Sequence, residues 1–144
     1  MKNIILVSIL TVLLTSCEVS PQKMEYGSDA CHLCEMTIVD KQHSAQIVSS
    51  KGKAYKYDSI ECMIRSTQKS MKDTDISLYL VADFSKPGEL VNAKNATYLI
   101  SENILSPMGA NLSAFSSSGD AKDTQEEFSG KLYSWDEIQA HFRK

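Results

Sequence analysis

The sequence predicts an α+β fold of two small, related ββαβ lobes, with antiparallel or mixed sheets and one helix in each lobe. Three observations support this prediction. Apolar residues alternate with other residues along 76–84, as in a strand with one buried face. Apolar residues recur at helical spacing along 59–72. The order strand, strand, helix, strand occurs over 36–84 and again over 96–133, which indicates an internal repeat.

Local signals place the elements of the first lobe. Lys51-Gly52 favours a tight turn between two extended segments, so a hairpin is expected early in the domain. Asp58 followed by Glu61 matches a helix N-cap and its reciprocal third residue, which predicts a helix over 59–72. The expected strands of this lobe cover 37–40, 44–50, 54–57 and 76–84.

The second lobe follows a break at Lys86-Pro87-Gly88. Its expected elements are strands at 96–100, 112–115 and 131–133 and a polar helix at 120–128. Ser134 with Glu137 repeats the capping pattern and begins a terminal helix.

Size and charge limit the classes of protein that fit. A chain of 144 residues with 42% apolar and 23% charged residues forms one compact domain or two very small ones. The formal net charge is −3, and nucleic-acid binding requires a clustered positive surface. We therefore expect no nucleic-acid partner.

The N-terminus has the features of an export signal. The apolar run over 4–14 is shorter than the roughly 20 residues that a membrane-spanning helix needs. Leu14-Thr15-Ser16-Cys17 resembles a bacterial lipobox, so we expect a lipoprotein signal peptide over 1–16 and acyl chains such as palmitate on Cys17. The alternative is an ordinary signal peptide whose Cys17 survives as a free thiol.

This interpretation divides the chain into three parts. Residues 17–28 lack periodicity and are expected to tether the domain to a membrane outside the cytoplasm. The domain would cover 29–144, with lobes at about 29–88 and 89–144.

Soft metal ligands are concentrated just before the first expected strand. Cys31, His32, Cys34 and Met36 fall within six residues. If 34–36 is extended, the Cys34 thiolate and the Met36 thioether lie on the same face of the chain. A thiolate with a neutral thioether suits Cu(I) better than Zn²⁺, Mg²⁺ or Ca²⁺.

Each of these residues also has a structural interpretation. Met36 can fill the core, and Met63 on the apolar face of the helix is expected there. Cys31 and Cys34 can form a C-x-x-C disulfide, or bind zinc with Cys62 and His32. Cys62 alone is as consistent with a buried inert thiol, and His32 with an exposed side chain. The remaining histidines, His43 and His141, are expected to be solvated.

A second candidate position lies far along the chain. Met108 occurs in Ser106-Pro107-Met108-Gly109, where proline and glycine predict a turn. An apolar side chain has less reason to occupy a turn than a strand, so Met108 is a candidate metal ligand.

The sequence resembles the NosL family of membrane-anchored copper chaperones, which help to assemble the copper sites of nitrous oxide reductase. The matching elements are the lipobox ending at Cys17, Cys34-Glu35-Met36, Ala45-Gln46-Ile47, the segment 57–63, Pro107-Met108-Gly109 and Ala114-Phe115. They are spread over most of the chain after the signal peptide and keep the family's order.

The resemblance implies a fold of two ββαβ lobes and a Cu(I) site formed by Cys34, Met36 and Met108. It implies a protein without turnover chemistry that is lipid-anchored in the cell envelope and faces the periplasm. The implied partners are an ABC-type membrane complex and apo nitrous oxide reductase. Two positions depart from the family pattern: Glu35 replaces a frequent glycine, and Cys31 is a cysteine that many members lack.

The extra cysteine leaves a second function open, that of a thiol-disulfide redox lipoprotein using Cys31 and Cys34. A thioredoxin-like enzyme places its C-x-x-C at a helix N-terminus, where the helix dipole lowers the thiol pKa. Here the β-branched residues Thr37, Ile38 and Val39 favour a strand instead. This context argues against a redox enzyme.

Overall fold

The computed structural model describes residues 18–143. The expected signal peptide at 1–16 and the lipidation site Cys17 lie outside this range. Within 18–143, no helix combines the length and the apolar character required to cross a membrane.

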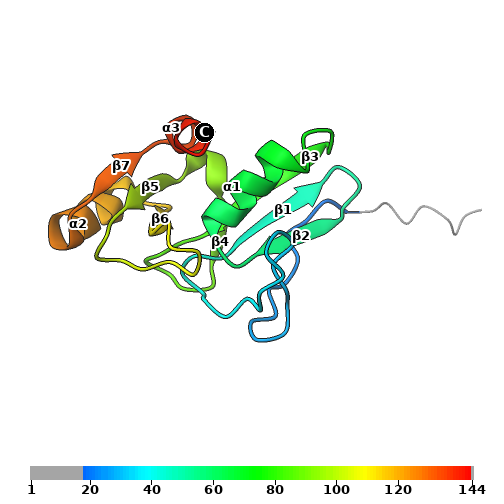
Figure 1. Ribbon diagram of the computed structural model, residues 1–144, viewed down its shortest axis with the longest axis horizontal. Coiled ribbons are helices and arrows are strands. Elements are labelled where there is room, and N and C mark those ends of the chain that lie inside the picture. The colour runs from blue at the N-terminus through cyan, green and yellow to red at the C-terminus, as the bar shows by residue number, and fades with distance from the viewer. Residues whose placement is uncertain (1–17, 144) are drawn as a thin grey trace, which may run out of the picture.

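Two antiparallel sheets lie side by side, each with helices packed against it (Figure 1). The first sheet has the strand order β2-β1-β3-β4 and the second has the order β6-β5-β7. In chain order the elements are β1 (Ala45–Ser49), β2 (Ala54–Tyr57), α1 (Ile60–Lys69), β3 (Ile76–Ala82), β4 (Leu90–Asn92), the short 3-10 helix η1 (Ala93–Asn95), β5 (Thr97–Ile100), β6 (Leu112–Phe115), α2 (Ser118–Phe128), β7 (Lys131–Tyr133) and α3 (Trp135–His141).

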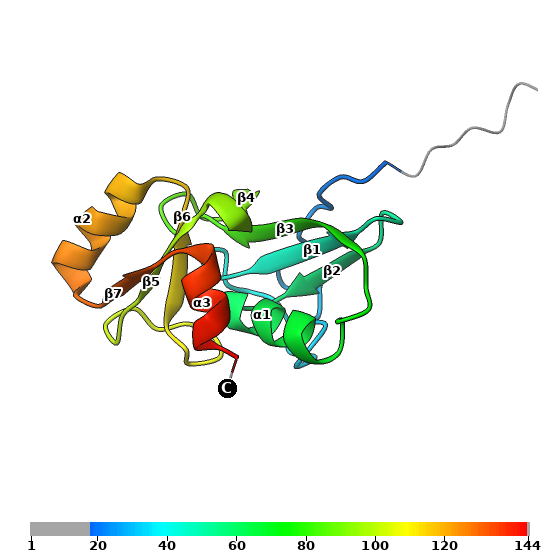
Figure 2. The same cartoon turned by 90° about the horizontal axis from the view of Figure 1, so that it is seen from above.

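The predicted repeat of two ββαβ lobes is confirmed. In β1-β2-α1-β3 and in β5-β6-α2-β7, the first strand pairs antiparallel with both the second and the third. The second half also carries α3, which lies beside α1 when the molecule is seen from above (Figure 2). The Gln68 side chain of α1 donates to the Gln139 carbonyl of α3 at 2.9 Å, so α3 joins the two halves.

The junction between β2 and α1 differs from the prediction. The N-cap is Ser59, whose hydroxyl accepts from the Cys62 backbone N–H at 3.2 Å, and not Asp58. The helix is also shorter than 59–72, because it ends at Lys69. Because Ser59 caps the helix N-terminus, the Asp58 carboxylate is not used as the N-cap.

Residues 37–40, predicted as a strand, do not form one. Only Thr37 makes an isolated bridge, to Ala30. Ile38 is fully buried, and its backbone pairs with Gly27 and Asp29 rather than with a sheet. The β-branched side chains favour extended backbone, but this segment pairs with the preceding loop at 27–30 and not with an edge of either sheet.

The segment expected to tether the domain packs against it from Gln22 onward. The Gln22 backbone donates to the Gln46 side chain at 2.8 Å and accepts from it at 2.8 Å. Met24 is only 9% exposed and belongs to the main core. At the other boundary, β4 extends the first sheet to Asn92, beyond the expected lobe limit at residue 88.

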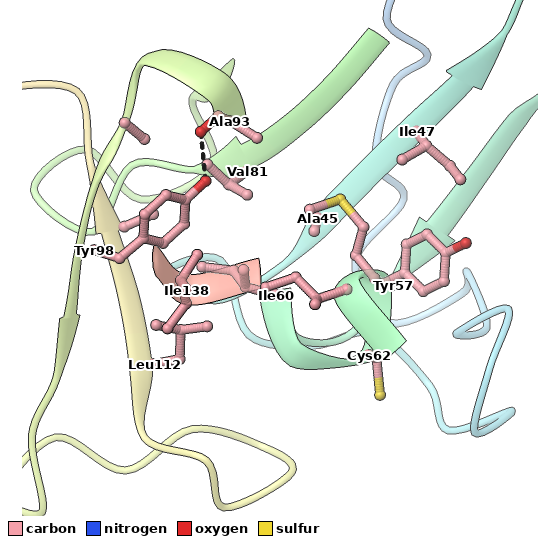
Figure 3. Close-up of a cluster of buried hydrophobic side chains, with 14 of the residues drawn as sticks. Ala45, Ile47, Tyr57, Ile60, Cys62, Val81, Ala93, Tyr98, Leu112 and Ile138 are labelled. Atoms are coloured by element: carbon pink, nitrogen blue, oxygen red, sulfur yellow. Dashed lines mark hydrogen bonds between the residues drawn. The ribbon is translucent and has the colours of Figure 1, made fainter. Parts of the chain in front are cut away.

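One apolar core runs through both lobes (Figure 3). Tyr57, Ile60 and Val81 of the first lobe belong to the same cluster as Tyr98 and other residues of the second. The Tyr98 hydroxyl donates to the Ala93 carbonyl at 2.6 Å, so its buried polar group is satisfied. Burying a large apolar side chain contributes about 1.5–3 kcal/mol, so this shared core holds the lobes in one orientation.

The turn between α2 and β7 depends on Gly130. Its φ is +120°, and a Cβ there would overlap the Ile100 carbonyl oxygen of β5. We expect Gly130→Ala to lower the free energy of unfolding by about 3 kcal/mol, because backbone strain and overpacking add. Urea unfolding of residues 18–144, which contain every described helix and strand, measures this loss.

Gly88→Ala is the matched control. Gly88 also has a positive φ, +89°, but nothing lies within 4 Å of the position that a Cβ would take there. The expected loss is about 1 kcal/mol, from backbone strain alone. Equal losses in the two variants would contradict the predicted clash with β5.

Candidate metal centre

Residues 31–36 form a tight turn instead of the expected extended segment. The Cys31 N–H donates to the Met36 carbonyl at 2.8 Å, and the Glu35 N–H donates to the Cys31 carbonyl at 2.9 Å. Glu35 has a φ of 64°, in the left-handed region. The expectation of an extended 34–36 is therefore wrong. Glycine adopts this conformation at little cost, which agrees with the glycine that the resemblance implies at this position.

The turn leaves its methionine on the surface. Met36 is 51% exposed, so the alternative that it fills the core is wrong. Cys34 is half-buried, and its exposure lies between that of Met36 and that of Cys31, which is only 1% exposed. The thioether is therefore accessible to an ion or a partner, and the nearby thiols are progressively less so.

Four donor side chains converge behind this turn. One ligand atom from each of Cys31, Cys34, Asp58 and Cys62 lies within 4.8 Å of the others. The turn supplies two thiols, the junction between β2 and α1 supplies the carboxylate, and the first turn of α1 supplies Cys62. Figure 3 shows the Cys62 side chain pointing from α1 away from the other labelled core residues. All three cysteines are free thiols.

Asp58 is the member of this cluster that the sequence analysis missed. Its side chain is 2% exposed, and within the described residues neither carboxylate oxygen has a hydrogen-bond partner. Burying an unpaired charge is costly, so such a group normally has a counter-ion or a metal. Lys56, two residues away, is engaged by Asp29 at 2.6 Å. Among the residues described, no cationic side chain forms an ion pair with Asp58.

Hydrogen bonding and burial shift the pKa values of the three thiols in different directions. The pKa of Cys31 is lowered to about 6, chiefly because the Cys62 thiol donates to its sulfur. Backbone N–H groups of Cys34 and Asp58 add to this effect. The same interaction raises the pKa of Cys62, and burial raises the pKa of Cys34. The interaction between Cys31 and Cys62 thus favours the thiolate form of Cys31 over that of Cys62.

The histidines lie outside this cluster. His32 is exposed, and its ring packs edge-on against Tyr55 with centroids 4.8 Å apart. The expectation that His43 is solvated is wrong, because it is 3% exposed and bonds to Asp40 at 2.8 Å and to Ser113 at 3.2 Å. His141 is exposed, as predicted.

The two methionines singled out elsewhere differ in environment. Met63 is fully buried, which confirms its assignment to the core. Met108 is half-buried and packs against the main core. The turn predicted around Met108 is present, with the Gly109 N–H donating to the Ser106 carbonyl at 3.0 Å.

A buried carboxylate anchors the Met108 turn to the helix that carries Cys62. Glu61 is fully buried, and its Oε1 accepts from the Ser106 hydroxyl at 2.7 Å and from the Ala110 N–H at 3.2 Å. Glu61 directly precedes Cys62 in α1. The second lobe therefore reaches the thiol-bearing end of α1 through this loop.

Comparison with known proteins agrees with the fold. Residues 22–142 match the sequence profile of the NosL family. The chain belongs to the NosL family. The NosL match begins at the residue where the N-terminal segment starts to pack on the domain.

Two relatives are informative. The copper-binding lipoprotein NosL of Stutzerimonas stutzeri is 28% identical over 120 residues, a match that covers 78% of this chain and 63% of the relative. This NosL chain thus spans less than two thirds of that protein's length. The crystal structure of the copper chaperone NosL from Shewanella denitrificans matches with a TM-score of 0.72 and 23% identity. That match covers 83% of this chain and 96% of the other, and it establishes the two-lobed fold.

The anchoring of the Met108 turn can be tested through Ser106. We expect Ser106→Ala to lower the free energy of unfolding by about 1–3 kcal/mol, because the buried Glu61 carboxylate loses its 2.7 Å donor. Ser118→Ala, at an exposed hydroxyl, is the control and should change stability by less than about 0.5 kcal/mol. Urea unfolding measures both. No difference between the variants would show that Glu61 does not hold this loop.

Proposed function

We propose that this NosL protein is a lipid-anchored Cu(I) chaperone that delivers copper for the assembly of nitrous oxide reductase. The observation that carries the proposal is the half-exposed Met36, two residues from the half-buried Cys34 on one surface turn. Copper binding by the named relatives supports the same metal.

In this proposal Cu(I) is bound by Cys34 and Met36 of the first lobe and by Met108 of the second. Thiolates and thioethers are the soft ligands that select Cu(I). The turn around Met108 is fixed to α1 through Glu61, which favours a site between the lobes. Because a thioether does not form disulfides, Met36 stays available in an oxidising compartment.

Delivery fits a site at the protein surface. Leu33 and Leu105 are 38% and 77% exposed, and they neighbour Cys34 and Ser106 in the chain. A partner that covered these apolar side chains would bring its own ligands to the copper, which could then pass by ligand exchange. The proposed partners are apo nitrous oxide reductase and an ABC-type membrane complex. The lipid on Cys17 would keep the protein at the envelope, facing the periplasm. The function needs no turnover chemistry.

Copper competition tests the proposed ligands. We expect the reduced 18–144 domain to bind about one Cu(I), Cys34→Ser to abolish binding, and Met36→Leu to weaken it roughly tenfold or more, the scale of losing one contributing group at a metal site. Cys62→Ser should retain copper. Anaerobic titration against a Cu(I) chelator measures each affinity.

Met63→Leu is the matched control for the methionine. Met63 is fully buried, so this variant should keep the copper affinity of the parent protein. Met36→Leu should leave the melting temperature almost unchanged, because the side chain is half-exposed and its volume is conserved. Equal copper loss from Cys34→Ser and Cys62→Ser would reject the proposed ligand set.

A thiol-disulfide function is the second candidate, because the sulfurs of Cys31, Cys34 and Cys62 lie within 4.8 Å of one another. The turn at 31–36 leads into irregular backbone and not into a helix, so no helix dipole activates Cys34.

We therefore expect no catalytic dithiol turnover in an insulin-reduction assay with dithiothreitol. A Cys31→Ser, Cys34→Ser double variant is the control and should give the same background rate. A rate that exceeds this background would favour the redox function.

A further inference from the structure

We propose that the anchored domain meets the membrane with one surface, the face of the first sheet opposite α1, here called the outer face. The thiol turn, residues 31–36, is then held away from the bilayer. This orientation rests on the lipid anchor at Cys17 in the proposed function. It adds which surface meets the lipid headgroups and which surface is left for a protein partner.

The two faces of the first sheet are covered by different parts of the chain. Because side chains alternate along a strand, β1 presents Ala45 and Ile47 to one face and Gln46 to the other. Ala45 and Ile47 belong to the main core together with Ile60 of α1. Figure 2 shows α1 and α3 on one side of this sheet and the start of the described chain on the other. The fully buried Gln46 is therefore covered by the N-terminal segment, residues 18–24.

The N-terminal segment is fixed to the outer face at three consecutive residues. Gln22 and Gln46 exchange two hydrogen bonds of 2.8 Å. The Lys23 carbonyl accepts from the Lys56 ammonium of β2 at 2.6 Å, and the Met24 sulfur accepts from the Gln46 amide at 3.5 Å. Hydrogen bonds from a charged donor are among the stronger ones. From Gln22 onward the chain is therefore part of the domain and not a free tether.

The remaining tether is short compared with the domain. Cys17 precedes Gln22 by five residues, which span at most about 18 Å even when fully extended. A folded domain of this size has a radius of gyration of about 14 Å and is roughly 35 Å across. The anchor therefore reaches only about half of the domain width from its fixed point. The domain cannot turn over above the bilayer, so the outer face stays toward the lipid.

Both loops that carry the proposed copper ligands contact α1, on the other side of the sheet. The Cys62 thiol of α1 donates to the Cys31 sulfur in the thiol turn, and Glu61 holds the Met108 turn through Ser106. A bilayer attracts exposed apolar side chains, but the short tether keeps this side away from it. These side chains are then left for a protein partner in the aqueous phase. Within residues 18–143, the exposed large apolar side chains all lie within three residues of one of these loops: Leu33, Met36, Val39 and Leu105.

The outer face is hollowed and carries balanced charge. A hollow of about 420 Å³ lies between the N-terminal segment and residues 88–90. Beside it, Lys23 pairs with Glu25 at 2.8 Å, and Lys86 pairs with Glu89 at 3.9 Å. Because positive and negative charges balance in these pairs, the contact does not depend on anionic lipid. Zwitterionic phosphatidylcholine is therefore a suitable membrane for the test.

Energy transfer from tryptophan to labelled lipid measures the orientation. The sequence has one tryptophan, so Trp135→Phe gives a background without this fluorophore. In that background, Lys23→Trp reports from the outer face and Leu105→Trp from the α1 side, and both replace exposed side chains. The full-length lipidated chain is reconstituted into phosphatidylcholine vesicles that contain dansyl-labelled phosphatidylethanolamine. We expect at least about twofold stronger transfer from Lys23→Trp, because the two positions lie on opposite sides of a domain roughly 35 Å across.

A longer tether is the matched control. Insertion of about 15 Gly and Ser residues between Ser20 and Pro21 extends the reach by roughly 20 Å. The two transfer efficiencies should then become similar, while binding to the vesicles is unchanged. Circular dichroism checks that each variant is folded.

Hydrogen exchange provides a measurement without substitutions. On the same vesicles, the parent protein should show slower exchange over 18–24 than the soluble 18–144 domain, and unchanged exchange over 31–36. The reverse pattern would overturn the orientation.

The failure of the orientation and the failure of the proposed function are distinguishable. Equal transfer from the two positions on the native tether would overturn the orientation. Stronger transfer from Leu105→Trp would overturn it too, and would show that the exposed apolar side chains rest on the bilayer. A full-length chain that does not float with the vesicles would reject the lipid anchor and the orientation with it. None of these results changes Cu(I) binding, which is measured on the 18–144 domain without vesicles.

Discussion

The capping of α1 by Ser59 is the interaction on which the metal centre depends. By accepting the Cys62 N–H, the Ser59 hydroxyl starts the helix one residue after Asp58. The Asp58 carboxylate is then released from any capping role and lies among the thiols, with Cys62 in the first turn. A cap at Asp58 would satisfy its carboxylate on the helix N–H groups and remove it from the cluster. The Ser59 hydroxyl thus leaves the Asp58 carboxylate available as a metal ligand.

The second lobe shows the same junction without the chemistry. There Ser117 caps α2 by accepting the Asp120 N–H at 3.2 Å, and Phe115 is fully buried just as Tyr57 is. No cysteine accompanies that cap in the sequence. Both lobes therefore contain the strand-to-helix junction, but only the first lobe has a cysteine beside it. The contribution of the second lobe is the loop that carries Met108, which Glu61 anchors.

Elements with strong local signals were predictable from the sequence. The bounds of β2, β6 and β7 agree with the expected strands, and Ser134 with Glu137 forms the expected capping box. The absence of a strand at 37–40 was not predictable, because strand formation depends on whether the segment can pair with a sheet edge. The donor residues Cys31, Cys34 and Cys62 were identifiable by type. Their meeting with Asp58 was not, because it requires the docking of the turn on α1.

The conformation of one residue explains why the expected metal geometry failed at the turn. An extended backbone would place Cys34 and Met36 on one face, but the left-handed Glu35 redirects the chain between them. The thiol is then half-buried beside Cys31, and the thioether is half-exposed. Cys34 thus has an exposure between that of the surface methionine and those of the buried donors, and the two proposed copper ligands of this turn differ in environment because of one left-handed residue.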